Sequence, residues 1–206
     1  MTGRLITFEG IDGSGKSTQI ARLQHSLESR GYEVLVVREP GGTPISEQIR
    51  ELLLHPDSAD LHPRTEALLF SAARSQLVHE VIRPALAAGS IVICDRYADS
   101  SIAYQGYGRE LPLEEIITTQ KFATSDLLPD LKVLLDVPVD ISSDRKSQEP
   151  ADRMESAGRA FMARVREGYL QLARTQPEQW LIVTGQTSEE QIAQEIENYV
   201  VKIISA

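Results

Sequence analysis

The residues at positions 10–17 read Gly-Ile-Asp-Gly-Ser-Gly-Lys-Ser, which have the types and spacing of a phosphate-binding loop, or P-loop. An apolar run precedes them and a helix-patterned stretch follows, as this loop requires. The glycines allow a tight turn whose N–H groups converge on a phosphate at the helix start. Lys16 can reach the β- and γ-phosphates, and the Ser17 hydroxyl can ligate Mg²⁺. The motif predicts binding of a nucleoside triphosphate, and a glycine-rich turn without a ligand is the alternative.

A second polar group, Asp95-Arg96-Tyr97, directly follows the apolar run at residues 91–94. A carboxylate at the end of a strand beside the P-loop strand can complete a Mg²⁺ shell. A salt-bridged strand end is the alternative for Asp95. We favour the metal role because the same turn presents Arg96 to the phosphates. The sequence therefore predicts Ser17 and Asp95 as the metal-binding residues.

Three further segments have side chains suited to a second substrate. Residues 38–43, Arg-Glu-Pro-Gly-Gly-Thr, form a rigid turn that either connects two elements or shapes the wall of an acceptor pocket. Phe70 and Arg74 are four residues apart on one predicted helix face, an aromatic plate beside a guanidinium, as a base pocket needs. Periodicity alone favours Phe70 as a core residue. Residues 98–106 carry many hydrogen-bonding side chains within one or two helical turns.

The elements that position these residues alternate between strands and helices. Short apolar runs predict strands at residues 5–8, 34–37, 91–94, 133–135 and 181–183. Helical patterns lie at residues 17–30, 44–54, 64–83, 112–124, from about 139, at about 160–174 and at 188–204. Ser188 and Gln191 have the spacing of a capping box. The alternation predicts an α/β fold with a five-stranded parallel sheet whose strand ends carry the ligands.

Length and composition restrict the class of protein. The 206 residues suit one α/β domain, which we place at residues 1–206. The net charge of −9 and a pI of about 5.0 disfavour a general nucleic-acid binder. The sequence shows no apolar stretch of membrane-spanning length and no signal peptide. We therefore expect a cytoplasmic protein without nucleic-acid or membrane partners.

The cysteine and the histidines give no sign of a metal site. Cys94 is the single cysteine, and its place in an apolar run predicts a buried strand residue rather than a reactive thiol. The histidines at positions 25, 55, 62 and 79 lack metal-ligand spacing.

Five segments together resemble bacterial thymidylate kinases, and they cover nearly the whole chain in the family's order. They are residues 8–19 (FEGIDGSGKSTQ), 38–43 (REPGGT), 68–74 (LLFSAAR), 95–106 (DRYADSSIAYQG) and 161–169 (FMARVREGY). The resemblance implies the P-loop nucleoside monophosphate kinase fold with a short lid, a homodimer, and ATP and Mg²⁺. It also implies the reaction, transfer of the γ-phosphoryl group of ATP to dTMP in dTTP synthesis.

The resemblance also implies roles for individual residues. Phe70 would stack on thymine, Arg74 would contact its carbonyl edge, and Ser101 and Gln105 would add polar contacts. Tyr104 would crowd the sugar 2′ position, and Asp12 would meet the 3′-hydroxyl. The implied ATP-binding residues are Gly10, Ile11, Asp12, Gly13, Ser14, Gly15, Lys16, Ser17 and Thr18. The implied substrate-binding residues are Glu39, Pro40, Arg50, Phe70, Arg74, Arg96, Tyr97, Ser101, Tyr104 and Gln105. The implied catalytic residues are Lys16, Arg96, Asp12, Arg153 and Arg145.

The lid, at about residues 144–155, is expected to supply a catalytic cation. Some members of the family carry an arginine among the variable P-loop positions, and residues 11–14 here contain none. Arg145, Lys146 and Arg153 are the candidates, and we place Arg153 ahead of Arg145. The polar, proline-broken segment 146–152 reads as a surface loop or as part of this lid.

Two other functions compete with this interpretation. One is a P-loop kinase acting on another monophosphate or on an alcohol. The other is a nucleotide-dependent switch, although the sequence contains neither an Asn-Lys-x-Asp guanine-binding motif nor an Asp-x-x-Gly after the third strand. A kinase needs an acceptor for turnover, whereas a switch hydrolyses the nucleotide slowly without one.

Overall fold

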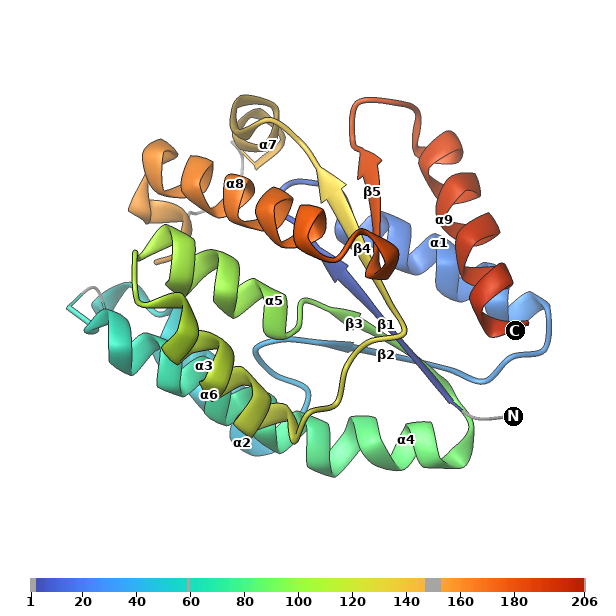
Figure 1. Cartoon of the computed structure of the whole chain (residues 1–206), viewed down its shortest axis with the longest axis horizontal. Coiled ribbons are helices and arrows are strands. Elements are labelled where there is room, and N and C mark those ends of the chain that lie inside the picture. The colour runs from blue at the N-terminus through green and yellow to red at the C-terminus, as the bar shows by residue number, and fades with distance from the viewer. Residues whose placement is uncertain (1–2, 59, 147–152, 206) are drawn as a thin grey trace.

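A five-stranded parallel sheet forms the centre of the protein, in the order β2-β3-β1-β4-β5 (Figure 1). The computed structural model describes residues 3–58, 60–146 and 153–205. The strands are β1 (Arg4–Glu9), β2 (Val34–Arg38), β3 (Ile91–Asp95), β4 (Leu131–Asp136) and β5 (Trp180–Thr184). Each covers one of the predicted apolar runs, so the predicted fold class is confirmed.

The sheet is buried on both faces because alternate side chains of its strands enter different clusters. Ile6 of β1 and Ile93 of β3 face α1 (Lys16–Ser29) and α9 (Glu189–Ile204), which cover one side. Leu5 and Val92 point the other way, into a cluster with the end of α3 (Pro63–Leu77). Cys94 is fully buried in this second cluster, as predicted. The runs of the central strands β1, β3 and β4 are nearly continuous because both of their faces are covered, whereas Val36 of β2 and Ile182 of β5 are exposed on the edge strands.

Several of the remaining helices lie toward the carboxyl ends of the strands (Figure 1). α2 (Pro44–Leu54) and α6 (Leu113–Thr124) both pack on α3. α8 (Arg159–Thr175) packs on η3 (Ile102–Gly108), a π-helical segment that continues α5 (Ala98–Ser101). The contact is close, since a Cβ at Gly108 would lie 2.6 Å from the Phe161 ring. α7 (Val139–Lys146) follows β4, and short 3₁₀ turns lie at Pro56–Ser58, Glu155–Ala157 and Pro177–Gln179.

The predicted capping box is confirmed at the start of α9. Ser188 accepts a hydrogen bond from the Gln191 backbone, and the Gln191 side chain accepts one from the Ser188 backbone.

The prediction that one helix ends at Arg83 is wrong. α3 passes into a π-helical segment, η2 (Val78–Ile82), and then into α4 (Arg83–Ala88), which ends at Gly89. Pro84 lies in the first turn of α4, where its missing N–H costs no helical hydrogen bond. Because Ile82 and Arg83 both have right-handed helical φ and ψ, the proline lies within a continuous helical run and does not end it.

Three loops that carry predicted site residues meet at one edge of the sheet, because parallel strands end on the same side. The P-loop follows β1, residues 39–43 follow β2, and Arg96 and Tyr97 follow β3. Residues 147–152, which hold most of the predicted lid loop, lie outside the described residues.

Candidate active site

One cavity of about 720 Å³ opens at this edge of the sheet. Its size is typical of a pocket for small molecules. The P-loop and the three other predicted segments line it together. Predicted residues in its wall are Asp12, Gly13, Ser14, Gly15, Lys16, Ser17, Thr18, Glu39, Pro40, Arg50, Phe70, Arg74, Asp95, Arg96, Ser101, Tyr104, Gln105 and Arg145.

The P-loop backbone has the strained turn that its glycines allow. Gly10 adopts a φ of +134°, and a Cβ there would lie 2.7 Å from the Leu135 carbonyl oxygen. Lys16 Nζ donates to the carbonyl oxygens of Gly10 and Ile11, at 3.1 and 3.2 Å. Burial, with a contribution from Arg96, lowers the pKa of Lys16 to about 8. Since an anion favours the charged form of an ammonium, a phosphate in the loop would raise this pKa again.

Asp95 and Ser17 fit the oxygen coordination that Mg²⁺ prefers. Asp95 Oδ1 is buried and has no hydrogen-bond partner in the part of the chain that the structure describes. The Ser17 side chain lines the same cavity. Within the described ranges no three His, Cys, Asp or Glu side chains gather as a metal cage. This arrangement suits Mg²⁺, which keeps waters and nucleotide phosphate oxygens as its other ligands.

Arg96 is fixed against the P-loop by several contacts. Its Nη2 donates to Asp12 Oδ1 at 2.7 Å, and its Nη1 donates to the Gly10 carbonyl oxygen at 2.9 Å. Nη1 also donates to the Tyr169 hydroxyl at 3.2 Å, and the guanidinium carbon lies 5.0 Å from the Tyr104 ring centroid. The residue has a φ of +72°, which is uncommon for a side chain other than glycine. Asp12 therefore orients Arg96 in addition to any contact with a sugar.

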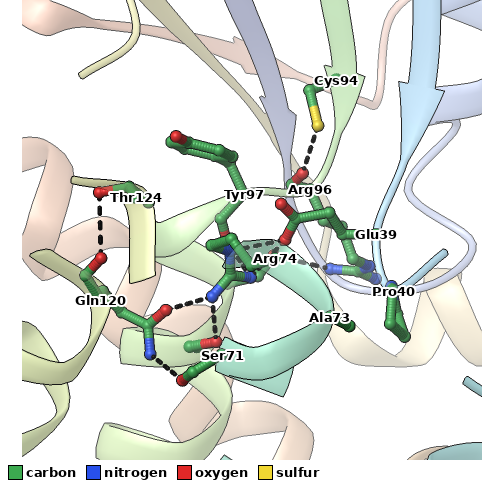
Figure 2. A network of polar contacts seen from close by, with 12 residues as sticks. Glu39, Pro40, Ser71, Ala73, Arg74, Cys94, Arg96, Tyr97, Gln120 and Thr124 are labelled. Carbon is green, nitrogen blue, oxygen red and sulfur yellow. Dashed lines mark hydrogen bonds and ion pairs between the residues drawn. The ribbon is translucent and has the colours of Figure 1, made fainter. Parts of the chain in front are cut away.

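Arg74 is the centre of a buried network rather than a free guanidinium (Figure 2). It is 1 % exposed and forms an ion pair with Glu39, whose Oε2 lies 2.7 Å from Nε and 2.5 Å from Nη2. Nη1 donates to Ser101 Oγ at 2.8 Å and to the Gln120 side chain, and Nη2 donates to the Tyr97 carbonyl oxygen. The guanidinium thus donates four hydrogen bonds to protein acceptors and pairs with a buried carboxylate. The implied contact with a base carbonyl requires one of these bonds to be shared or exchanged.

Phe70, Tyr104 and Gln105 form part of the wall beside this network. Phe70 is half-buried and packs against a core cluster while it lines the cavity, so the core and pocket interpretations both describe it. The Tyr104 hydroxyl lies 3.5 Å from Asp12 Oδ2. Gln105 Nε2 donates to Glu66 Oε1 at 2.9 Å.

Tyr97 does not line the cavity, contrary to the expectation that it contacts the substrate. Its side chain is fully buried in the cluster behind β3, and its hydroxyl donates to the Leu127 carbonyl oxygen at 3.2 Å. The site uses its backbone instead, because its carbonyl oxygen accepts from Arg74. Adjacent residues at a strand end point in different directions, so the run Asp95-Arg96-Tyr97 does not enter the pocket as a unit.

The two lid arginines lie in different environments, and Arg145, unlike Arg153, lies at the P-loop. Arg153 is 8 % exposed, with its Nη1 donating to Glu66 Oε2 at 2.7 Å. Arg145 is exposed at the P-loop, where it donates to the Gly185 and Gly13 carbonyl oxygens at 2.9 and 3.4 Å. The sequence around Arg153 could not show this pairing, because Glu66 is 87 residues away in the chain. The Lys146 side chain is outside the described part of the lid.

Glu9 was not among the predicted site residues, although it is buried beside them. Its carboxylate accepts from the Tyr97 backbone N–H at 2.9 Å and from Ser100 Oγ at 2.6 Å. Ser100 also bonds the Tyr169 hydroxyl at 2.7 Å, which links Glu9 to a contact of Arg96. Burial, then the charge of Asp99, raises the pKa of Glu9 to about 8. An acidic residue that ends an apolar run was the signal in the sequence.

Replacing Glu9 with glutamine should change how stability depends on pH. The unfolded carboxyl releases its proton near its ordinary pKa, whereas the folded one holds it to about pH 8. The wild type therefore loses stability as the pH rises from about 5 to 8, and the variant lacks this contribution. Tm measured from pH 5 to 8.5 should rise for Glu9→Gln relative to wild type as the pH increases. Parallel Tm curves would contradict the assigned protonation.

The fold and the pocket define a P-loop nucleoside monophosphate kinase, in which a P-loop and a second set of polar and aromatic side chains face one cavity. A family model described as Thymidylate kinase matches residues 8–196. A protein of this name from Desulforudis audaxviator is 51 % identical over 90 % of this chain and 85 % of its own length. Another, from an Exiguobacterium species, is 45 % identical over 98 % of this chain and 96 % of its own. The chain belongs to the thymidylate kinase family, whose reaction is the ATP-dependent phosphorylation of dTMP to dTDP.

Proposed function

We propose that this cavity binds ATP at its P-loop end and dTMP at the end formed by α3, α5 and η3. The observation that carries the proposal is the continuity of the cavity, which is lined both by Lys16 and by Phe70 and Gln105. Arg96 contacts the P-loop backbone and lines the same space. Two phosphates bound at the two ends would therefore meet beside one guanidinium.

Positioning and charge neutralisation account for the transfer step without a general base. The acceptor is a phosphate oxygen, and the second pKa of a phosphate monoester is about 6, so it is largely ionised at neutral pH. Lys16 would hold the β- and γ-phosphates, and Arg96 would neutralise charge between donor and acceptor. Arg145, which reaches the P-loop, is the lid cation that the geometry favours. Mg²⁺ held by Ser17 and Asp95 would supply further positive charge at the phosphates.

At the dTMP end we propose that Phe70 stacks on the base and that Ser101 and Gln105 add polar contacts. Tyr104 would exclude a 2′-hydroxyl, and Arg50 would bind the acceptor phosphate. Arg50 Nη1 donates to the Pro40 carbonyl oxygen at 2.9 Å, which fixes it beside the turn after β2. Glu39 and Pro40 then form the wall near the metal, and Asp12 reaches the sugar.

The acceptor preference tests this assignment. We expect ADP release from ATP to be fastest with dTMP, slower with dUMP, and negligible with AMP or CMP. A steady-state coupled assay with all four monophosphates measures it, and a reaction without acceptor is the control. A preference for AMP would contradict the proposed pocket.

We also propose that the single domain acts as a homodimer in the cytoplasm, with a lid at about residues 144–155. Leu52 of α2, Leu68 of α3 and Phe122 of α6 are apolar side chains exposed by 57, 61 and 86 % on helices that pack side by side. Covering them in a second copy would remove apolar area from water. Among the described helices, none has the length and apolar character needed to cross a bilayer. Sedimentation equilibrium tests the dimer, and a monomer at micromolar concentration would contradict it.

A further inference from the structure

We propose that Glu66 is a positioning residue that ties the dTMP end of the cavity to the C-terminal end of the lid. The inference rests on the proposed function, because it assigns Gln105 to the dTMP site and Arg153 to the end of the lid. Glu66 lies on α3, and it does not line the cavity. Its effect on the reaction would therefore pass through its partners.

Glu66 is fully buried, with an exposed fraction of 0 %, and it accepts from three side chains. Oε1 accepts from Gln105 Nε2 at 2.9 Å and from Arg109 Nε at 3.2 Å. Oε2 accepts from Arg109 Nη2 at 3.0 Å and from Arg153 Nη1 at 2.7 Å. None of the donors belongs to α3. A buried carboxylate needs such partners, so Glu66 fixes the positions of all three side chains.

On the dTMP side, the carboxylate determines how Gln105 presents its amide. An ionised carboxylate only accepts hydrogen bonds, so it orients the amide with its nitrogen toward α3. Gln105 is 1 % exposed and lines the cavity. Its orientation against a base thus depends on a residue that the base does not touch.

On the lid side, Arg153 joins Glu66 to the segment that follows residues 147–152. Arg153 Nε donates to the Leu53 carbonyl oxygen of α2 at 2.7 Å, and Nη2 lies 3.4 Å from Met154 Sδ. Met154 is 4 % exposed, lines the cavity and packs in the cluster that Phe70 contacts. The pair therefore holds the end of the lid against the wall of the proposed dTMP site.

The alternative is that the Glu66–Arg153 ion pair stabilises the fold and does not affect the reaction. In that case its loss would lower Tm and leave the kinetic constants unchanged. If it positions Gln105 and the lid, its loss should also change the constants for dTMP. Glu66→Gln removes the charge and replaces one acceptor oxygen with an NH2 group. In either orientation of the amide this group would face a guanidinium N–H, that of Arg109 alone or those of Arg109 and Arg153, so the partners should separate.

We expect Glu66→Gln to raise KM for dTMP and to lower kcat, each by roughly 10-fold or more, since a displacement of about 1 Å can cost 10²-fold. KM for ATP should change by less than about twofold. Glu66→Asp, which keeps the charge and shortens the side chain, should shift the constants in the same direction and serves if the amide variant fails to fold. The matched control is Glu115→Gln, whose carboxylate pairs with Arg64 at 2.7 Å on the exposed surface.

Arg153→Met separates this proposal from a direct role of Arg153 in phosphoryl transfer. If the Glu66–Arg153 ion pair positions the end of the lid, Arg153→Met should lower kcat as Glu66→Gln does. The double variant should then lose little more activity than either single variant. The proposal is overturned if Arg153→Met lowers kcat while the Glu66 variants keep wild-type constants. It is also overturned if the Glu66 variants lower Tm and leave kcat and KM for dTMP unchanged. An error in the dTMP site itself would appear separately, as an unchanged KM for dTMP in Gln105→Ala.

Discussion

Lys16→Met should lower kcat by roughly 10²–10³-fold or more, the effect of losing one preorganised charge-stabilising donor. The buried Lys16 ammonium lies at the P-loop carbonyl oxygens, where a nucleotide phosphate would replace them as its partners. Methionine keeps most of the side-chain volume and removes the charge. Steady-state kinetics with dTMP and saturating ATP measures the loss, and circular dichroism establishes that the variant folds.

Arg22→Met is a suitable control for Lys16→Met. Arg22 is on the same helix, α1, but it does not line the cavity, and it pairs with Glu189 and Glu190 at 3.1 Å on the surface. Surface pairs of this kind contribute little, so turnover should stay near that of the wild type. A Lys16→Met enzyme with native circular dichroism and near-normal kcat would contradict the proposed role of the P-loop.

Arg96→Lys should reduce kcat for every monophosphate that the enzyme accepts, by roughly 10²-fold or more. Arginine presents a fork of donors that here spans Asp12, the Gly10 carbonyl oxygen and Tyr169, and lysine cannot reproduce it. The lysine keeps one positive charge and avoids leaving Asp12 without a cation nearby. The measurement is kcat for dTMP and dUMP, because a residue that serves the transferred group should lower both by the same factor.

Phe70→Ala provides the contrast for Arg96→Lys. An aromatic wall that binds the base should affect KM for dTMP and the preference for dTMP over dUMP more than kcat. If Arg96→Lys changed the preference between acceptors as much as Phe70→Ala does, the separation of phosphate-binding from base-binding residues would be wrong.

The sequence predicted the sheet and the residues at its edge because both depend on local patterns. Continuous apolar runs mark strands buried on two faces, and the P-loop is a contiguous motif with its own strand and helix. Alternation of strands and helices then brings Lys16, Asp95 and Arg96 to one edge. Pro84 shows where local reasoning fails, because the π-helical segment before it lets the helical backbone continue through the proline.

The rest of the site could not be predicted because it depends on buried partners that are distant in the chain. Arg74 has the spacing of a base-pocket residue, yet its donors are engaged by Glu39 and Gln120, 35 and 46 residues away. Arg153 has the position of a lid cation, yet Glu66 holds it at a distance of 87 residues. Periodicity assigns a face to such residues, but their partners are set by tertiary packing.

The central claim, that one cavity transfers a phosphoryl group from ATP to dTMP, is tested most directly by identifying the product. ³¹P NMR of the enzyme with Mg²⁺, ATP and dTMP should show ADP and dTDP forming in equal amounts, with no reaction when dTMP is omitted. ADP accompanied by inorganic phosphate, without dTDP, would show that the bound nucleotide is hydrolysed instead and would contradict the account.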